Sequence, residues 1–220
     1  MKIAVVYTAT TPELTQGIAD EIRKRFGDKK VDVVSYQDPS ILQEARDNGG
    51  LTPGCARRLM DLYEQGVKEG ADFLFNVCSS VGEVARLAKP LYELSGTGFV
   101  RIDEDMAHAA VAAGTRIGVV ATLPTTLEPT KQLVRECAES QGKNVVLVDA
   151  LAEGAFGLDQ NQFKEKLIET GRKVRDRVDV LLFAQGSMAY AEKDVAEALG
   201  LPVFSSIRFG VEALARRAEA

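Results

Sequence analysis

The chain has 220 residues, of which 45% are hydrophobic, and its formal net charge is −5. This composition is typical of a globular protein, and an acidic chain without a Lys/Arg cluster is unsuited to binding nucleic acid. The apolar runs of six to eight residues are far shorter than the roughly 20 residues that span a bilayer. No signal peptide precedes the first predicted strand, so we expect a cytoplasmic protein with no nucleic-acid or membrane partner.

The cysteines and the histidine limit the kinds of site that the chain can build. Cys55, Cys78 and Cys137 are widely spaced and include no Cys-x-x-Cys pair, which is typical of reduced thiols rather than of a disulfide framework or a zinc site. His108 is the single histidine, so a His-based metal site and a Ser-His-Asp triad are both disfavoured. We therefore expect no metal site, and a structural role for His108.

The first half of the chain alternates between apolar strands and amphipathic helices. Thr11 precedes Pro12 and is a suitable N-cap for the first helix. The polar segment 37–52 predicts a loop long enough to act as a lid, and the sequence leaves open whether it closes over a ligand. The predicted strands lie at 2–7, 31–36, within 72–80 and at 99–102, and the predicted helices at 12–26, 53–70 and 81–94.

The second half repeats this alternation. Acidic residues 103–105 open a helix, because the positive end of a helix dipole favours negative charge. Strands are predicted at 115–121, 145–148, 180–184 and 203–204, and helices at 128–141, 161–177, 188–199 and 207–218. Regular alternation predicts an α/β fold with largely parallel sheets flanked by helices.

Two stretches of the chain share one design. Asp72 and Asp179 each precede a short apolar strand with a small polar exit, and counting six residues on from each reaches Cys78 and Gln185. The opening strand, Lys-Ile-Ala-Val-Val-Tyr-Thr, also has a counterpart, Arg-Ile-Gly-Val-Val-Ala-Thr, that begins at Arg116. This pattern indicates an internal duplication in which the two strand ends are equivalent.

The duplication predicts two similar α/β lobes related by a pseudo-twofold axis. We place lobe one at residues 1–102, with 206–220 packing back onto it, and lobe two at 103–205. Ligand sites favour the crevice between such lobes, so we expect the site there.

Cys78 is the candidate catalytic residue. It lies at the carboxyl end of a buried strand and directly before a predicted helix, where open α/β sheets bind ligands. Backbone N–H groups at a helix start attract a carboxylate and favour a thiolate, so we expect a lowered pKa for this thiol. The alternative is an ordinary core cysteine, since free cysteines are often buried.

Several segments together resemble the aspartate/glutamate/hydantoin racemase superfamily. The resemblance covers nearly the whole chain, and its most specific parts are the Cys-Ser-Ser of the first half and the Ala-Thr-x-x-Thr-Thr turn of the second. It is carried by Val77-Cys78-Ser79-Ser80, Arg101-Ile102-Asp103-Glu104, Ile117-Gly118-Val119-Val120-Ala121-Thr122 with Thr125-Thr126, and Gln185-Gly186-Ser187-Met188.

The resemblance implies a two-lobed protein that needs no cofactor or metal and has its site between the lobes. Racemases of this type use two cysteines, one per lobe, on opposite faces of the substrate's α-carbon. Cys78 corresponds to the first of them. The residues implied to hold the substrate are Thr8, Thr10, Ser79, Ser80, Thr122, Thr125, Thr126, Gln185, Gly186 and Ser187, although threonine and serine also commonly cap helices.

The chain departs from this pattern at the second cysteine, where it has Gln185. An amide is no base near neutral pH, so a symmetric two-thiol mechanism is in doubt. Three hypotheses stay open: a racemase or isomerase of a small carboxylate, with water or Ser187 as the second proton donor; a malonate-type decarboxylase that uses Cys78 alone; and a non-catalytic carboxylate-binding protein. The sequence leaves both a monomer and a homodimer open.

Overall fold

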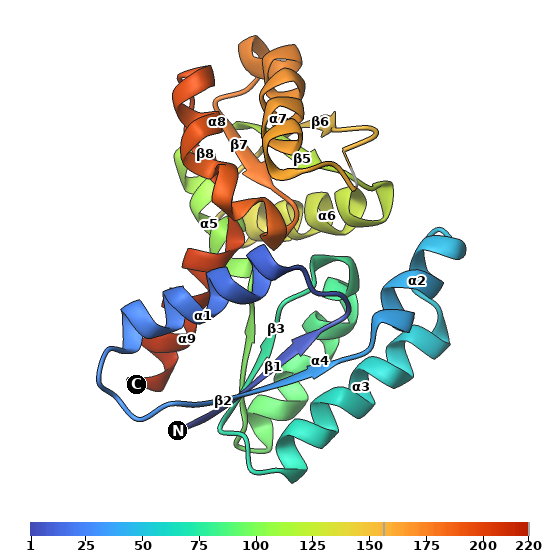
Figure 1. Cartoon of the computed structure of the whole chain (residues 1–220), viewed down its shortest axis with the longest axis vertical. Helices are drawn as coiled ribbons and strands as arrows, with labels where there is room; N and C mark the ends of the chain where they lie inside the picture. Colours follow the sequence, from blue (N-terminus) through green and yellow to red (C-terminus); the bar gives the residue numbers. More distant parts are fainter. Residues whose placement is uncertain (156, 220) are drawn as a thin grey trace. The chain divides into compact units, whose positions relative to one another are not determined.

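The computed structural model describes residues 1–155 and 157–219. By its internal contacts the chain divides into two compact units. Unit 1 comprises Met1–Ile102 together with Ile207–Ala220, and unit 2 comprises Asp103–Ser206. Each unit contains one four-stranded sheet with helices packed against it (Figure 1).

The sheet of unit 1 has the strand order β2-β1-β3-β4, and every pairing in it is parallel. Its strands are β1 (Lys2–Tyr7), β2 (Asp32–Gln37), β3 (Phe73–Asn76) and β4 (Gly98–Arg101). The helices of the unit are α1 (Pro12–Phe26), α2 (Pro39–Asp47), α3 (Pro53–Lys68), α4 (Gly82–Leu94) and α9 (Ser206–Ala218), and a 3-10 turn, η1 (Ser79–Val81), precedes α4.

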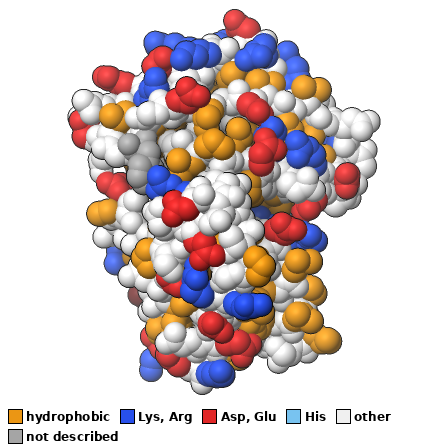
Figure 2. Space-filling view, turned by 90° about the vertical axis from the view of Figure 1, so that its right-hand side faces the viewer, with side chains coloured by type: hydrophobic (Ala, Val, Ile, Leu, Met, Phe, Trp, Pro, Cys, Tyr) orange, Lys and Arg blue, Asp and Glu red, His pale blue; other side chains and the backbone are white. Residues whose placement is uncertain are grey.

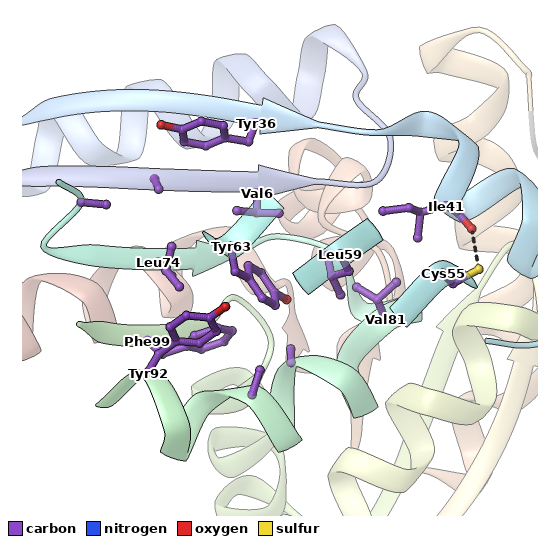
Figure 3. Close-up of a cluster of buried hydrophobic side chains, with 14 of the residues drawn as sticks. Val6, Tyr36, Ile41, Cys55, Leu59, Tyr63, Leu74, Val81, Tyr92 and Phe99 are labelled. Atoms are coloured by element: carbon purple, nitrogen blue, oxygen red, sulfur yellow. Dashed lines mark hydrogen bonds between the residues drawn. The ribbon is translucent and has the colours of Figure 1, made fainter. Parts of the chain in front are cut away.

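The core of unit 1 forms because alternate strand residues point to opposite faces of the sheet. Ala4, Val6 and Leu74 join a buried cluster with side chains from α3 and α4. In Figure 3, Tyr63 of α3 lies against Tyr92 and Phe99, with ring centroids 5.8 and 5.1 Å away and the rings nearly perpendicular. This edge-to-face geometry is one that aromatic rings prefer.

The last helix, α9, packs beside α1 (Figure 1). Arg25 of α1 lies 3.3 Å from a carboxylate oxygen of Glu212, and Lys29 lies 2.7 Å from one of Glu219. Gly210 of α9 comes so close to Ile102 that an added Cβ would lie 2.9 Å from the Ile102 carbonyl oxygen. The C-terminal helix is therefore part of the packing of unit 1.

Unit 2 repeats the sheet order of unit 1 as β6-β5-β7-β8, again with parallel pairings throughout. Its strands are β5 (Arg116–Ala121), β6 (Val146–Leu151), β7 (Val180–Phe183) and β8 (Val203–Phe204). Its helices are α5 (Glu104–Ala113), α6 (Pro124–Ser140), α7 (Gln160–Val174) and α8 (Glu192–Leu199), with 3-10 turns η2 (Arg175–Arg177) and η3 (Gly186–Ala191).

The paired aspartates of the sequence have the same structural role in both units. Asp72 accepts the Lys2 backbone N–H at 2.7 Å, and Asp179 accepts that of Arg116 at 2.8 Å. Each carboxylate thus holds the start of the first strand of its sheet. The two parallel sheets flanked by helices confirm the predicted fold class.

The segment 37–52 is not the predicted loop, because helix α2 occupies most of it. Asp38 caps α2 by accepting the Ser40 N–H at 2.9 Å, and Ile41 and Ala45 bury one side of the helix. The Cys55 thiol of α3 donates to the Ile41 carbonyl at 3.4 Å (Figure 3). A single buried stripe on a short polar helix is a weak sequence signal, which explains the error.

Two helix starts also differ from the prediction. Helix α6 begins at Pro124 rather than at Glu128, and 188–199 is part 3-10 turn and part α-helix. None of the helices in the described ranges is long and apolar enough to cross a membrane. Both signs of charge are spread over the face shown in Figure 2, as expected of the mixed charge in the sequence.

Candidate active site

The carboxyl ends of β1 and β3 bring the first set of candidate residues together. The two strands are parallel neighbours in which Val6 pairs with Asn76. Thr8 follows β1 directly, and Cys78 lies two residues beyond the end of β3. Thr8 and Cys78, which are 70 positions apart in the sequence, therefore meet at the carboxyl end of the two central strands.

Cys78 is partly exposed as a residue, and its thiol is surrounded by hydrogen-bond donors. Burial raises its pKa above the usual value, while the Thr8 hydroxyl, the backbone N–H groups of Ser80 and Val81 and the Ser80 hydroxyl act in the opposite direction. Because burial is the larger effect, the pKa of the thiol lies above its ordinary value, which favours the protonated form. The expectation of a lowered pKa is therefore wrong for the resting thiol.

Thr8 is fully buried. Apart from the thiol, its hydroxyl oxygen has no hydrogen-bond partner among the described residues. A buried hydroxyl without other partners is costly unless it serves a nearby group. We interpret the Thr8 hydroxyl as a hydrogen-bond donor to the sulfur. This hydrogen bond becomes stronger when the sulfur is a thiolate.

The backbone at Cys78 is held by two residues that the sequence reading missed. The Tyr63 hydroxyl of α3 donates to Asn76 Oδ1 at 2.8 Å, and Asn76 Nδ2 donates to the Cys78 carbonyl at 3.1 Å. Both side chains are almost completely buried. A polar Asn at the end of an otherwise apolar strand, two residues before the cysteine, was the available signal.

The remaining candidate residues of unit 1 differ in their exposure to solvent. Ser79 and Ser80 lie in η1 and are each 6% exposed, so the turn that carries them lies mostly beneath the surface. Thr10, in contrast, is exposed and donates to Gln37 Oε1 at 3.4 Å. No contact of the described residues joins Thr10 to the group around the thiol.

At the equivalent strand ends of unit 2, Thr122 and Gln185 form what we call the Thr122–Gln185 clasp. Gln185 Oε1 accepts the Thr122 backbone N–H at 2.8 Å and lies 3.0 Å from its hydroxyl, and Gln185 Nε2 lies 2.8 Å from the same hydroxyl. Since a backbone N–H needs an acceptor, this contact fixes which end of the amide is the oxygen. The amide is therefore held in one orientation.

Thr125 and Thr126 lie in the first turn of α6, directly after this clasp. The Thr126 backbone N–H donates to the Leu123 carbonyl at 3.1 Å, as in a helix start. The Thr125 hydroxyl oxygen is buried and has no partner among the described residues. An unsatisfied hydroxyl at a helix N-terminus is suited to an anion, because the helix dipole acts in the same direction.

Gly186 and Ser187 begin η3 and are half-buried. The other cysteines are buried within helices: Cys55 lies in the first turn of α3, and Cys137 lies in the last turn of α6. His108 Nδ1 lies 3.1 Å from the Gln141 amide nitrogen, between α5 and the end of α6. In the described ranges no group of His, Cys, Asp and Glu could hold a metal ion.

The chain was compared with known protein families, curated proteins and solved structures. The family model described as Asp/Glu/Hydantoin racemase matches residues 3–214. No curated protein matches the sequence. Among solved structures, allantoin racemase from Klebsiella pneumoniae is 18% identical with a TM-score of 0.70, and the match covers 100% of this chain and 88% of that one.

Two further structures are similar at low identity. Aspartate racemase from Picrophilus torridus is 14% identical with a TM-score of 0.68, over 100% of this chain and 95% of that one. Glutamate racemase RacE1 from Bacillus anthracis is 14% identical with a TM-score of 0.69, over 99% and 81%. These likenesses concern the fold, and the family match confirms the resemblance seen in the sequence. The chain belongs to the Asp/Glu/hydantoin racemase family, which supports a racemase or isomerase of small carboxylates.

Proposed function

We propose that the protein is a cofactor-independent isomerase of a small amino acid or diacid, in which Cys78 exchanges the proton on the α-carbon. The proposal rests on the groups that surround the Cys78 thiol. Cys78 is partly exposed at the carboxyl end of a strand, and four donor groups from Thr8, Ser80 and Val81 act on its sulfur. A structural core cysteine has no need of such donors.

The surroundings suit a sulfur that changes charge during the reaction. The thiol loses its proton, and the thiolate then takes the α-proton of the substrate, which leaves an electron pair on the α-carbon and its carboxylate. Donors that are already in place stabilise the thiolate without reorganisation. Return of this proton by the same thiol gives exchange without inversion. For inversion, water or Ser187 protonates the opposite face, and this proton replaces the one that the thiol first released to water, so protons balance over the cycle.

The substrate carboxylate is the second element of the proposal. Ser79 and Ser80 lie next to the thiol in sequence, and the unsatisfied Thr125 hydroxyl lies in the first turn of α6. Hydroxyls and backbone N–H groups of this kind stabilise the charge that develops on carboxylate oxygens. We propose that these residues, with Thr122 and Thr126, bind carboxylate groups of the substrate.

Gln185 has a different proposed role. Its carbonyl oxygen accepts the Thr122 N–H and its NH₂ group reaches the Thr122 hydroxyl, so one amide hydrogen is left to donate to a substrate oxygen. An amide neither takes nor gives a proton near neutral pH, so protonation on the second face must come from water or from Ser187. This asymmetry predicts a slow racemase, or an isomerase that needs one thiol.

A malonate-type decarboxylase is the second candidate, favoured by the raised pKa of Cys78. Loss of carbon dioxide itself generates the carbanion, so only one protonation is needed, and a thiol that is protonated at rest supplies it. Turnover should then fall as the pH rises. The third candidate function is the binding of a carboxylate without catalysis.

The test is incubation in deuterated water with a panel of amino acids, hydroxy acids, diacids and malonates, followed by NMR. The proposal expects deuterium at the α-carbon of one member of the panel, with change of configuration or double-bond geometry. Carbon dioxide release from a malonate without exchange elsewhere would instead establish the lyase. Binding of panel members without either reaction would leave the non-catalytic alternative.

A further inference from the structure

Strand β4 ends in a buried arginine. Arg101 is 4% exposed and pairs in register with Asn76 of β3. Paired residues of neighbouring parallel strands point to the same face of a sheet. Two residues earlier on each strand, Leu74 and Phe99 point into the core formed with α3 and α4. The Arg101 side chain therefore lies on this face of the sheet, beside Asn76.

The guanidinium of Arg101 occupies the place of a side chain at the start of α4. Gly82 is the first residue of this helix, and a Cβ added to it would overlap Arg101 Nη2 and lie 3.0 Å from Arg101 Cζ. The backbone angles of Gly82, φ −57° and ψ −30°, are those of an ordinary helix, in which alanine is favoured over glycine. The contact with Arg101 therefore explains a glycine at a position where the backbone does not require one.

The turn before Gly82 carries the backbone groups that act on the thiol. Cys78 immediately precedes η1, and the last two N–H groups of η1 reach the sulfur. From the strand side, Asn76 donates to the Cys78 carbonyl at 3.1 Å. Arg101 thus contacts one support of Cys78, at Gly82, and lies beside the other, Asn76.

The stability of α4 does not account for a cation in this place. Burying a charge costs free energy even when the charge is paired, and the N-terminus of a helix favours negative rather than positive groups. The charge does act close to the thiol. Burial is the main cause of the high pKa of the Tyr63 hydroxyl, and of the nearby charges Cys78 raises this pKa further while Arg101 lowers it. Both groups therefore lie near the same hydroxyl.

We infer that Arg101 is a positioning residue of the Cys78 site, whose guanidinium holds η1 and the start of α4 where their N–H groups face the thiol. This inference rests on the proposed function of Cys78, because it names the residue that prepares the thiol for its role. Arg101 acts through the turn and not on the substrate. An arginine that only supported β4 would leave the reactivity of the sulfur unchanged, and this reactivity can be measured without a substrate.

The measurement is the alkylation rate of Cys78 by iodoacetamide in the folded full chain at about pH 8, because alkylation reports how readily the thiolate forms. Mass spectrometry assigns the modified cysteine. Arg101→Met keeps much of the side-chain volume without the guanidinium and should slow alkylation about tenfold or more. Arg101→Lys keeps the charge and should recover part of this loss. Arg217→Met is the matched control: Arg217 also contacts β4, at the Phe99 carbonyl 3.1 Å away, and its loss should leave the rate unchanged.

Gly82→Ala displaces the guanidinium without removing it, because the new methyl group needs the space that Arg101 occupies. Alkylation should therefore slow in this variant. In the double variant G82A/R101M the methyl group enters the space that the guanidinium has left, so alkylation should be no slower than in R101M alone. Gly50→Ala, where an added Cβ meets nothing within 4 Å, is the control for replacing a glycine and should react like the wild type.

Slower alkylation of folded Arg101→Met, with partial recovery in Arg101→Lys, would support the inference. An unchanged or faster rate in a variant with a native circular dichroism spectrum would overturn it, as would equal slowing by Arg217→Met or a further loss in the double variant. If Arg101→Met does not fold, the comparison of Gly82→Ala with Gly50→Ala decides. A wild-type protein that is inert in the exchange panel but shows the expected alkylation rates would refute the proposed function and leave the positioning role of Arg101 intact.

Discussion

The two equivalent strand ends carry different side chains, and this difference controls the chemistry proposed for the protein. In unit 1 the position is a thiol supplied with donors, and in unit 2 it is an amide fixed by Thr122. A thiol with donors around its sulfur can give and take a proton, whereas an amide cannot. The likeness to racemases covers the fold, and we propose that it extends to one of the two acid/base positions.

Gln185→Cys should add the missing proton donor. We expect faster racemisation of the substrate found in the exchange panel, by about tenfold or more, because a thiol transfers protons far better than an amide. Gln185→Ala should reduce turnover only moderately, because it removes a hydrogen bond and no acid/base group. Chiral chromatography of the products measures both, and a Gln185→Cys variant with unchanged racemisation would contradict this role.

Thr8→Val should change the pH dependence of turnover. The Thr8 hydroxyl lowers the pKa of the Cys78 thiol, so removing it while keeping the shape of the side chain raises that pKa further. If Cys78 acts as a thiolate base, the rising limb of kcat/KM against pH should move to higher pH. A control, Thr10→Val, alters a threonine outside this group and should leave the limb in place. An unmoved limb for Thr8→Val would separate the hydroxyl from the catalytic thiol.

At the level of single strands and helices, two hydrogen bonds fix the position of the end of β3. Tyr63 of α3 donates to Asn76, which donates to the carbonyl of Cys78. Tyr63→Phe leaves Asn76 Oδ1 buried and unpaired, so we expect a loss of about 1–3 kcal/mol of stability in urea unfolding. Tyr36→Phe removes a hydroxyl bonded to the more exposed Glu69 and should cost less. Equal losses would show that the Tyr63–Asn76 bond has no special importance.

The start of β5 depends on Asp179, which accepts hydrogen bonds from the backbone and side chain of Arg116. These bonds lower its pKa from 3.8 to about 2. A carboxyl whose folded pKa is lowered stabilises the fold above its unfolded pKa, and this contribution is lost as the pH falls from 3.8 towards 2. Asp179→Ala should therefore lower Tm at pH 7, and its difference from the wild type should shrink across that window. A difference that is constant with pH would contradict the assignment.

For the molecule as a whole, features that are local in the sequence were predictable. The repeated Asp, apolar strand and polar exit predicted two parallel sheets, because strand periodicity and duplication are visible without contacts. The placement of Thr8 beside Cys78 follows from the pairing of β1 with β3, which the parallel alternation makes natural. The pKa of Cys78 was not predictable, because it depends on how deeply distant side chains bury the sulfur. Tyr63 was missed for the same reason: its partner, Asn76, lies 13 residues away on another element.

Cys78 is the residue that we propose as the acid/base group of the protein. The most direct measurement is α-proton exchange, followed by NMR in deuterated water, of Cys78→Ser beside Cys137→Ser, whose thiol is buried within α6. We expect Cys78→Ser to lose exchange by about a hundredfold or more while still binding the substrate, because a hydroxyl forms an anion far less readily than a thiol. Cys137→Ser should keep exchange near the wild-type rate. Full exchange by a folded Cys78→Ser protein would contradict this role and make Cys78 a residue of the core.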